Sequence, residues 1–325
     1  MSLLSEMTRP YWLPRLNAIT DVRRSSVRNW IAAGEYQIYS PLQVDSIALA
    51  FQEISPVATA YAGDIVRMSV AAFESVEGIS PSSRLPRSTA WLLVRAYYSA
   101  FFAAHCVLRI FGRSCTQLDG EAIGAIHAIA DLFDQRAETT LSRGLYRTLV
   151  DTDGKVVRLT RLSVADGGSH TVLWSEFSAL LRHLSDRILE DTATRPGQAV
   201  SAKLVEIQNA LLGFSNTTGW LSVIRNRVNY QHEYGAWFPY RERVPYYDGL
   251  FDILERWRAD PMELSFSTDK GRELQRFLEA IVVVLGLCRA IIEDMSSRAP
   301  AGRSFHRHGF NALIDLLNQP RRLIA

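Results

Sequence analysis

Long apolar segments, separated by short polar or proline- and glycine-containing breaks, dominate the hydrophobic pattern of this chain. The clearest is "AWLLVRAYYSAFFAAHCVLRIFG" (90–112), which is apolar on nearly every side and closes on Gly112, a residue typical of the position after a helix end. Ser88 or Thr89 can cap its start. A helix that is apolar all round is typical of the buried centre of a bundle or of a subunit interface.

Most of the remaining chain also favours helices. We expect them at about 120–149, 173–190, 198–213, 217–232, 249–258, 270–297 and 309–318. Residues 41–78 have a helical composition too, broken once before Pro56. By contrast, "DTDGKVVRLTRLSVADGGSH" alternates between two turn signals and indicates a small hairpin-like insertion at about 151–171. The pattern therefore predicts an all-α fold that carries one such insertion.

The breaks divide the chain into three parts. Residues 1–80 are predicted to form an N-terminal arm or helical extension, which the breaker-rich stretch "ISPSSRLPRST" (79–89) joins to the rest. Residues 88–235 form the expected helical core with its insertion. Residues 236–325 comprise an aromatic loop, "GAWFPYRERVPYYDG", and the C-terminal helices.

The net charge of the chain limits which classes of partner it can bind. The chain has 325 residues, and its 36 basic side chains nearly balance 34 acidic ones, for a net charge of +2. It is therefore not a polyelectrolyte that would coat nucleic acid unaided. Only three basic residues are lysines, and the segment 78–118 contains arginines but no acid. Guanidinium groups suit phosphate binding, although a general compositional bias toward arginine is the simpler explanation.

Several common chemistries lack their signatures. The three cysteines lie far apart, which argues against disulfides or a zinc site. No phosphate-binding glycine loop, GxSxG or HExxH motif occurs, so we expect neither metal nor cofactor. His306 and His308 stand two apart and would point apart on a helix. The N-terminus does not resemble a signal peptide, and "AIVVVLGLC" is too short to span a bilayer, so we expect a cytoplasmic protein without a membrane segment.

The segment "RNRVNYQHEYG" (225–235) places many polar groups at the end of an apolar helix. On one continuous helix Arg225 and His232 would lie within about 20° of one line and roughly 10 Å apart, with Asn229 between them. Arg227 would lie about 140° from His232, so it joins them only if the helix ends near Tyr230.

An arginine beside a histidine suits phosphodiester chemistry. Arginine braces phosphate oxygens, histidine transfers a proton near neutral pH, and RNA supplies its own nucleophile, the 2′-hydroxyl. One histidine provides only an acid or a base at a time, but a second copy across a two-fold axis would supply another. A solvated, structural helix end explains the same residues, and spacing alone favours that interpretation.

The segment resembles the signature of HEPN domains (the "higher eukaryotes and prokaryotes nucleotide-binding" helical domains). In "RNRVNYQH", Arg225 matches the arginine, Asn226 the polar residue after it and His232 the histidine. In "RVNYQHEY", Arg227, His232 and Tyr234 match the stricter pattern Arg-x4-His-x-Tyr. The upstream "VRAYYSAFFAAHCVLRIFG" resembles the aromatic-alanine helix of these domains. The resemblance covers at most residues 88–235, with an unusually long gap between its two helices.

This resemblance implies an up-and-down bundle of four or five helices that dimerises around a shared cleft. It implies metal-independent RNA cleavage leaving a 2′,3′-cyclic phosphate, in a toxin or antiviral-defence system with an antitoxin or other defence protein as partner. Arg225, Arg227 and His232 are then the candidate catalytic residues, with Asn226 and Asn229 as supporting groups. Tyr234 is either a site of modification by a partner or a packed loop residue.

Two other interpretations stay open. The chain can be an inactive HEPN-like scaffold or sensor, or an unrelated helical adaptor that matches the motif by chance. His105, Tyr97 and Tyr98 can line a cleft, but a histidine within "FFAAHCV" more often belongs to a core or an interface.

Overall fold

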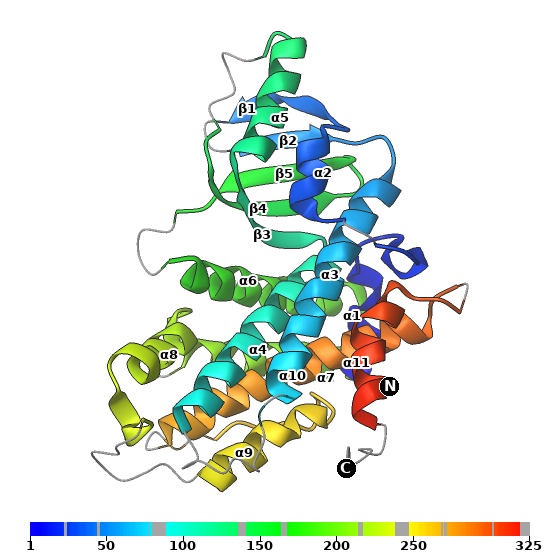
Figure 1. Cartoon of the computed structure of the whole chain (residues 1–325). Coiled ribbons are helices and arrows are strands. Elements are labelled where there is room, and N and C mark those ends of the chain that lie inside the picture. The colour runs from blue at the N-terminus through cyan, green and yellow to red at the C-terminus, as the bar shows by residue number, and fades with distance from the viewer. Residues whose placement is uncertain are drawn as a thin grey trace, which may run out of the picture.

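The protein consists of a helical layer and a smaller antiparallel sheet, as the computed structural model in Figure 1 shows. The structure describes residues 1–22, 25–43, 46–77, 79, 89–135, 141–163, 168–213, 217–237, 247–267, 269, 272–300 and 302–318. The fold is predominantly helical, as the hydrophobic pattern predicts.

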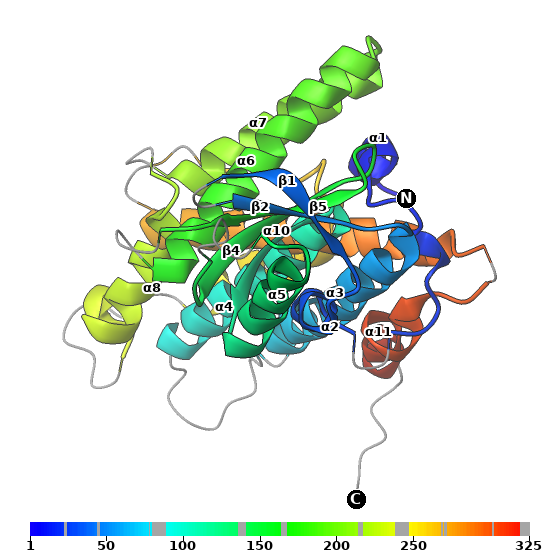
Figure 2. The ribbon, with the colours of Figure 1, turned by 90° about the horizontal axis from the view of Figure 1, so that it is seen from above.

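The helical layer is built around α4 (Thr89–Ile110). Packed against it are α3 (Ile54–Glu77), α10 (Glu273–Ser297), α6 (Gly168–Asp191) and α8 (Trp220–Tyr230), while α7 (Arg195–Leu212) pairs with α6. Figure 2 shows α6 and α7 projecting from the layer as a pair. The shorter helices are α1 (Leu3–Thr8), α2 (Val27–Ala33), α5 (Gly120–Leu132), α9 (Tyr247–Glu255) and α11 (Phe310–Asn318).

The central position of α4 follows from its composition. The helix is long and apolar enough to cross a membrane, but 67% of its most apolar window is buried inside the protein. It therefore fits the core position that its all-round apolar sequence predicts. Gly112 ends the segment with φ at 68°, a left-handed conformation that glycine adopts without steric cost.

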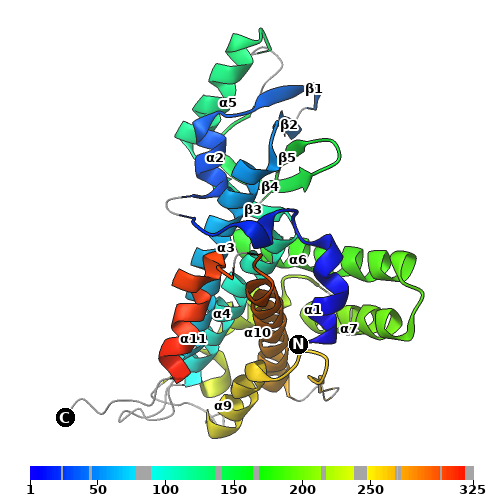
Figure 3. The ribbon, with the colours of Figure 1, turned by 90° about the vertical axis from the view of Figure 1, so that its right-hand side faces the viewer.

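Five antiparallel strands form the sheet, in the order β1-β2-β5-β4-β3. Their bounds are β1 (Gln37–Gln43), β2 (Ser46–Ala50), β3 (Arg113–Leu118), β4 (Gly144–Asp151) and β5 (Val156–Arg161). Leu49 pairs with Val157, and Thr148 pairs with both Ser114 and Leu159. Strands from the first 50 residues and from the expected insertion thus belong to one sheet. Figure 3 shows α2 and α5 on one side of it.

The sheet corrects the expected all-α class. Residues 41–43 and 46–50 form strands rather than helix, β3 was not predicted, and β4 occupies the end of the helix expected at 120–149. The expected hairpin is present as β4 and β5, but it begins at Gly144 and its strands have neighbours on both sides. Short apolar runs fit a buried strand or a helix equally well, and pairing with distant segments decides between them.

Buried polar contacts join the two layers. The Tyr61 hydroxyl on α3 lies 2.6 Å from the Thr148 hydroxyl on β4, which in turn lies 2.6 Å from the Ser114 hydroxyl on β3. Nearby, the Arg109 guanidinium on α4 forms a buried ion pair with Asp64 on α3 at 3.3 Å. These contacts satisfy polar groups that burial would otherwise leave costly.

Candidate functional site

Helix α8 carries the polar segment, and its end determines where each side chain points. The helix packs through Trp220, Leu221, Ile224 and Val228 and ends at Tyr230, not at 232 as expected. His232 follows with φ at 55° and Tyr234 with φ at 63°. Left-handed backbone at two non-glycine residues turns the chain out of the helical path. His232 therefore does not continue the line of Arg225.

Arg225 points inward from α8, and its side chain is almost entirely buried at 6% relative exposure. Its Nη2 lies 3.2 Å from Nε2 of His170, near the start of α6, and its Nη1 lies 3.5 Å from the Tyr230 hydroxyl. Its Nε has no hydrogen-bond partner. Among the described residues, no carboxylate lies within 4.0 Å of this guanidinium. Arg225 is thus a buried cation that no carboxylate of the described residues neutralises.

Aromatic rings surround the same guanidinium. Its central carbon lies 5.3 Å from the ring centroid of Tyr97, 5.5 Å from that of Tyr98 and 5.8 Å from that of Tyr230. Cation–π attraction offsets part of the cost of burying the charge. Tyr97 and Tyr98 come from α4, so α4, α6 and α8 meet at this point (Figure 1).

The hydrogen bonds fix the protonation of His170. Arginine offers only donors, so His170 Nε2 accepts from Arg225 and the imidazole proton lies on Nδ1. That Nδ1–H donates to the Tyr97 hydroxyl at 2.8 Å. The hydroxyl also accepts from Trp174 Nε1 at 3.2 Å, which leaves its own proton for the Ser222 hydroxyl at 3.0 Å. One arrangement of protons therefore satisfies all three hydrogen bonds of the Tyr97 hydroxyl.

The pKa shifts of the cluster are consistent with a neutral His170 imidazole. Burial, and then the positive charge of Arg225, lowers the pKa of His170 to about 4. Burial also raises the pKa of Tyr97 above its ordinary value. At neutral pH the cluster thus holds one positive charge, on Arg225, beside a neutral histidine.

Arg227 lies in a different environment. Its guanidinium contacts the Tyr234 hydroxyl at 3.4 Å and the carboxylates of Glu273 at 3.7 Å and Glu233 at 3.8 Å. The hydrogen bond with Tyr234 is the main reason that the pKa of Arg227 is raised. Tyr234 donates to Glu273 at 2.6 Å, and burial followed by this bond raises its pKa to about 12. Arg227 is therefore neutralised by its neighbours.

The other predicted residues lie toward solvent. His232 is exposed, and its ring centroid lies 6.0 Å from that of Trp237. Asn226 is exposed and Asn229 is partly exposed. The described contacts of these three side chains include no hydrogen bond to Arg225. Within one chain the structure brings Arg225 together with His170, and Arg227 together with Tyr234, but it does not join either arginine to His232.

His170, Ser222 and Trp174 are site residues that the sequence did not indicate. A histidine beside the glycines of "DGGSH" marks a helix start, but nothing in its spacing shows that it faces α8. His105, expected in a core or interface, lies with its Nδ1 3.1 Å from Arg109 Nη1 and its ring 4.8 Å from that of Phe101. Burial lowers its pKa well below the usual value.

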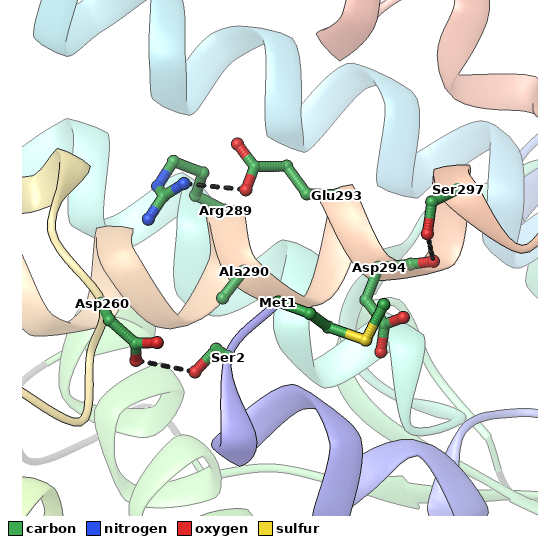
Figure 4. Close-up of a pocket in the computed structure, with 8 residues that line it drawn as sticks. All are labelled: Met1, Ser2, Asp260, Arg289, Ala290, Glu293, Asp294 and Ser297. Carbon is green, nitrogen blue, oxygen red and sulfur yellow. Dashed lines mark hydrogen bonds and ion pairs between the residues drawn. The ribbon is translucent and has the colours of Figure 1, made fainter.

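Cavities among the described residues lie away from this site. One of about 310 Å³ lies beside α10, where Arg289 pairs with Glu293 at 2.7 Å and Ser2 donates to Asp260 at 2.7 Å (Figure 4). A larger one of about 860 Å³ is lined by Arg303, Arg307 and His308 and by an acid, Asp21. His306 is fully buried while His308 is exposed, so the two histidines do point apart. The described residues contain no group of three potential metal ligands.

No protein-family model, curated protein or solved structure matches this chain. The resemblance to HEPN domains therefore rests on the motif and the upstream helix within residues 88–235.

Proposed function

We propose that this protein is a metal-independent endoribonuclease of the HEPN type, which works as a cytoplasmic homodimer. The observation that carries the proposal is the buried guanidinium of Arg225, which lacks a carboxylate partner among the described residues and lies beside the polar end of α8. The predominantly helical fold and the central aromatic helix α4 support it.

A buried cation without a counter-charge is costly to the folded protein. Removing a charge from water costs several kcal/mol, and Arg225 recovers only part of this through His170 and the aromatic rings. A bound phosphate would supply the missing charge, and a planar guanidinium can hold two of its oxygens. Arg225 is therefore the better candidate for the phosphate-binding arginine, because Arg227 already pairs with Glu273 and Glu233.

The reaction requires only groups that RNA and this segment provide. The 2′-oxygen attacks the adjacent phosphorus, a base takes the 2′-hydroxyl proton, the bond from phosphorus to the 5′-oxygen breaks, and an acid protonates that oxygen. His232 is exposed on the surface, where the same segment of a second subunit can approach it. In the dimer, His232 of each subunit supplies the base or the acid, and Asn226 and Asn229 offer further hydrogen bonds.

The biological setting follows from the family resemblance. We place the protein among toxins or antiviral-defence effectors, with an antitoxin or other defence protein as its partner. Modification of Tyr234 by such a partner must break its bond to Glu273, because the hydroxyl is engaged there. A modified Tyr234 would also free Arg227 from one of its contacts.

Purified protein incubated with total RNA in EDTA tests the proposal. We expect fragments ending in 2′,3′-cyclic phosphate from the wild type and from His308→Ala, in which an exposed histidine outside the site is replaced. His232→Ala should yield none while keeping the wild-type melting temperature. Fragments from His232→Ala at the wild-type rate, or cleavage that stops in chelator, would contradict the proposed chemistry.

A second function is favoured by one observation, the absence of contact between Arg225 and His232 within the chain. A HEPN-like scaffold or sensor would bind RNA at Arg225 without cutting it. In that case wild type and His232→Ala would bind a labelled RNA equally well, and neither would release fragments.

A further inference from the structure

We propose that Arg225 and His170 together form a phosphate-binding subsite at the start of α6, with aromatic rings beside it that stack on the base of the same nucleotide. This inference deepens the proposed function, on which it rests for RNA as the ligand. The juxtaposition of the two side chains carries it, since neither the motif nor the sequence spacing pairs them.

Two sources of positive potential, the Arg225 guanidinium and the amino end of α6, converge on this point. Arg225 is buried, has an unpartnered Nε and is without a carboxylate among the described residues. His170 is the third residue of the 24-residue helix α6, whose first turn contains no acid. The amino end of a long helix adds a partial positive charge that favours an anion. Together these features make a site for a phosphate group.

In the ligand-free protein, His170 Nε2 accepts a hydrogen bond from Arg225 that a phosphate oxygen could accept instead. When a phosphate oxygen accepts from Arg225 instead, His170 Nε2 can bind a proton and donate to the same phosphate. The Tyr97 hydroxyl holds Nδ1–H throughout, so the ring keeps its orientation.

Within the described part of the chain, the charged and titratable groups that face His170 are few. They are Arg225 on α8 and Tyr97, Tyr98 and His105 on α4. Arg225 and burial keep His170 neutral before the anion arrives. A phosphate reverses this balance, because its negative charge favours the protonated imidazole. Binding of the anion and uptake of a proton by His170 are therefore coupled.

Aromatic side chains next to this subsite point to a nucleotide rather than to free phosphate as the ligand. The Phe101 ring lies 4.4 Å from the His170 ring at an interplanar angle of 35°. Tyr230, beside Arg225, is 67% exposed, an unusual state for a large ring next to a buried charge. Bases stack on such rings only when they are free of a duplex, so the ligand is single-stranded RNA.

Imidazole NMR of the full-length protein tests the subsite without requiring cleavage. Inorganic phosphate should move the titration midpoint of His170 upward from about 4 by at least one pH unit. Adenosine 3′-monophosphate should bind more tightly than phosphate, and adenosine without phosphate should leave the midpoint unchanged. A midpoint that does not respond to phosphate or to the nucleotide would overturn the proposal.

Matched variants locate the effect. His170→Asn should weaken binding of adenosine 3′-monophosphate about tenfold or more, while His183→Asn, an exposed position on the same helix, should bind as the wild type does. Tyr230→Ala should lose the preference for the nucleotide and keep affinity for phosphate. Equal nucleotide affinity in wild type and His170→Asn would refute the subsite.

The two proposals fail separately. If His170 responds to phosphate but total RNA stays intact, the subsite stands and the ribonuclease proposal falls. If RNA is cut and His170 does not respond, the ribonuclease stands and the subsite is wrong.

Discussion

Two arginines on α8, only two residues apart, lie in opposite environments. Arg225 is buried, and its one strong polar contact is a neutral histidine; Arg227 is partly exposed and contacts two carboxylates and a tyrosine. Both match a version of the same motif, so sequence cannot choose between them. Their surroundings distinguish them, because Arg227 contacts two carboxylates whereas Arg225 contacts none among the described residues.

The difference shows how stability and binding oppose each other. Exposed ion pairs such as those of Arg227 contribute about 0–1 kcal/mol each and suit a helix end. A buried guanidinium without a partner costs more than it returns until an anion arrives. We therefore propose that Arg225 serves anion binding rather than stability.

Replacing each arginine by methionine should give the largest contrast. Arg225→Met is expected to reduce RNA cleavage by about 100-fold or more, because it removes a cation aimed at the phosphate. It should change the free energy of unfolding by no more than about 1 kcal/mol, since an apolar side chain suits a buried position. Arg227→Met should keep cleavage within about threefold, since it removes only exposed ion pairs.

Single-turnover cleavage and urea unfolding of the same three proteins measure both quantities. Equal losses of cleavage in the two variants would show that both arginines act. A larger loss in Arg227→Met would reverse the assignment.

The next largest effects are expected from tyrosine-to-phenylalanine substitutions beside the two arginines. Tyr97→Phe removes the acceptor of the fully buried Trp174 Nε1–H and of His170 Nδ1–H, so it should destabilise the fold by about 1–3 kcal/mol. Tyr234→Phe removes a half-exposed bond to Glu273 and should cost about 1 kcal/mol or less. Urea unfolding curves measure the free energy of unfolding of both variants. A larger loss in Tyr234→Phe than in Tyr97→Phe would show that the contacts around Arg225 contribute less to stability than those around Arg227.

The sequence predicted the central helix, the helix order after residue 168 and the position of Arg225 on a helix. It did so because α4 is apolar all round and because the 3.6-residue period persists in α6, α7 and α10. The strands were missed where apolar runs are short: β2 is only five residues long, and its partner β5 lies more than 100 residues further on. Long-range pairing leaves no local signal.

For the same reason, only part of the site could be predicted from the sequence. Arg225 belongs to a recognisable segment, but His170 lies 55 residues away in sequence and reaches it only because α6 and α8 both pack on α4. Helix α8 ends early, at Tyr230, and His232 adopts a left-handed backbone conformation. The motif does not encode either feature, because both depend on local packing.

Acid should weaken the contacts between His170 and Arg225. His170 has a lower pKa folded, about 4, than unfolded, about 6.5, so the unfolded chain binds more protons between those values. Stability linked to His170 is therefore complete above pH 6.5 and is lost as the pH falls toward 4. We expect the free energy of unfolding to decline more steeply from pH 7 to pH 5 in the wild type than in His170→Asn. Parallel declines would show that His170 is not held neutral.

The smallest expected effect belongs to Glu273, the acid that compensates Arg227. Glu273→Gln keeps the size of the side chain and removes its charge, so the free energy of unfolding should change by less than about 1 kcal/mol, and less still in high salt. The clearer signal is at Tyr234, whose pKa of about 12 is raised by burial and by its bond to Glu273. Ultraviolet titration should show this pKa lower in Glu273→Gln, since a neutral amide no longer opposes the phenolate, while the burial contribution remains. An unchanged Tyr234 pKa would show that Glu273 does not contact Tyr234 in solution, and would leave Glu233 as the carboxylate beside Arg227.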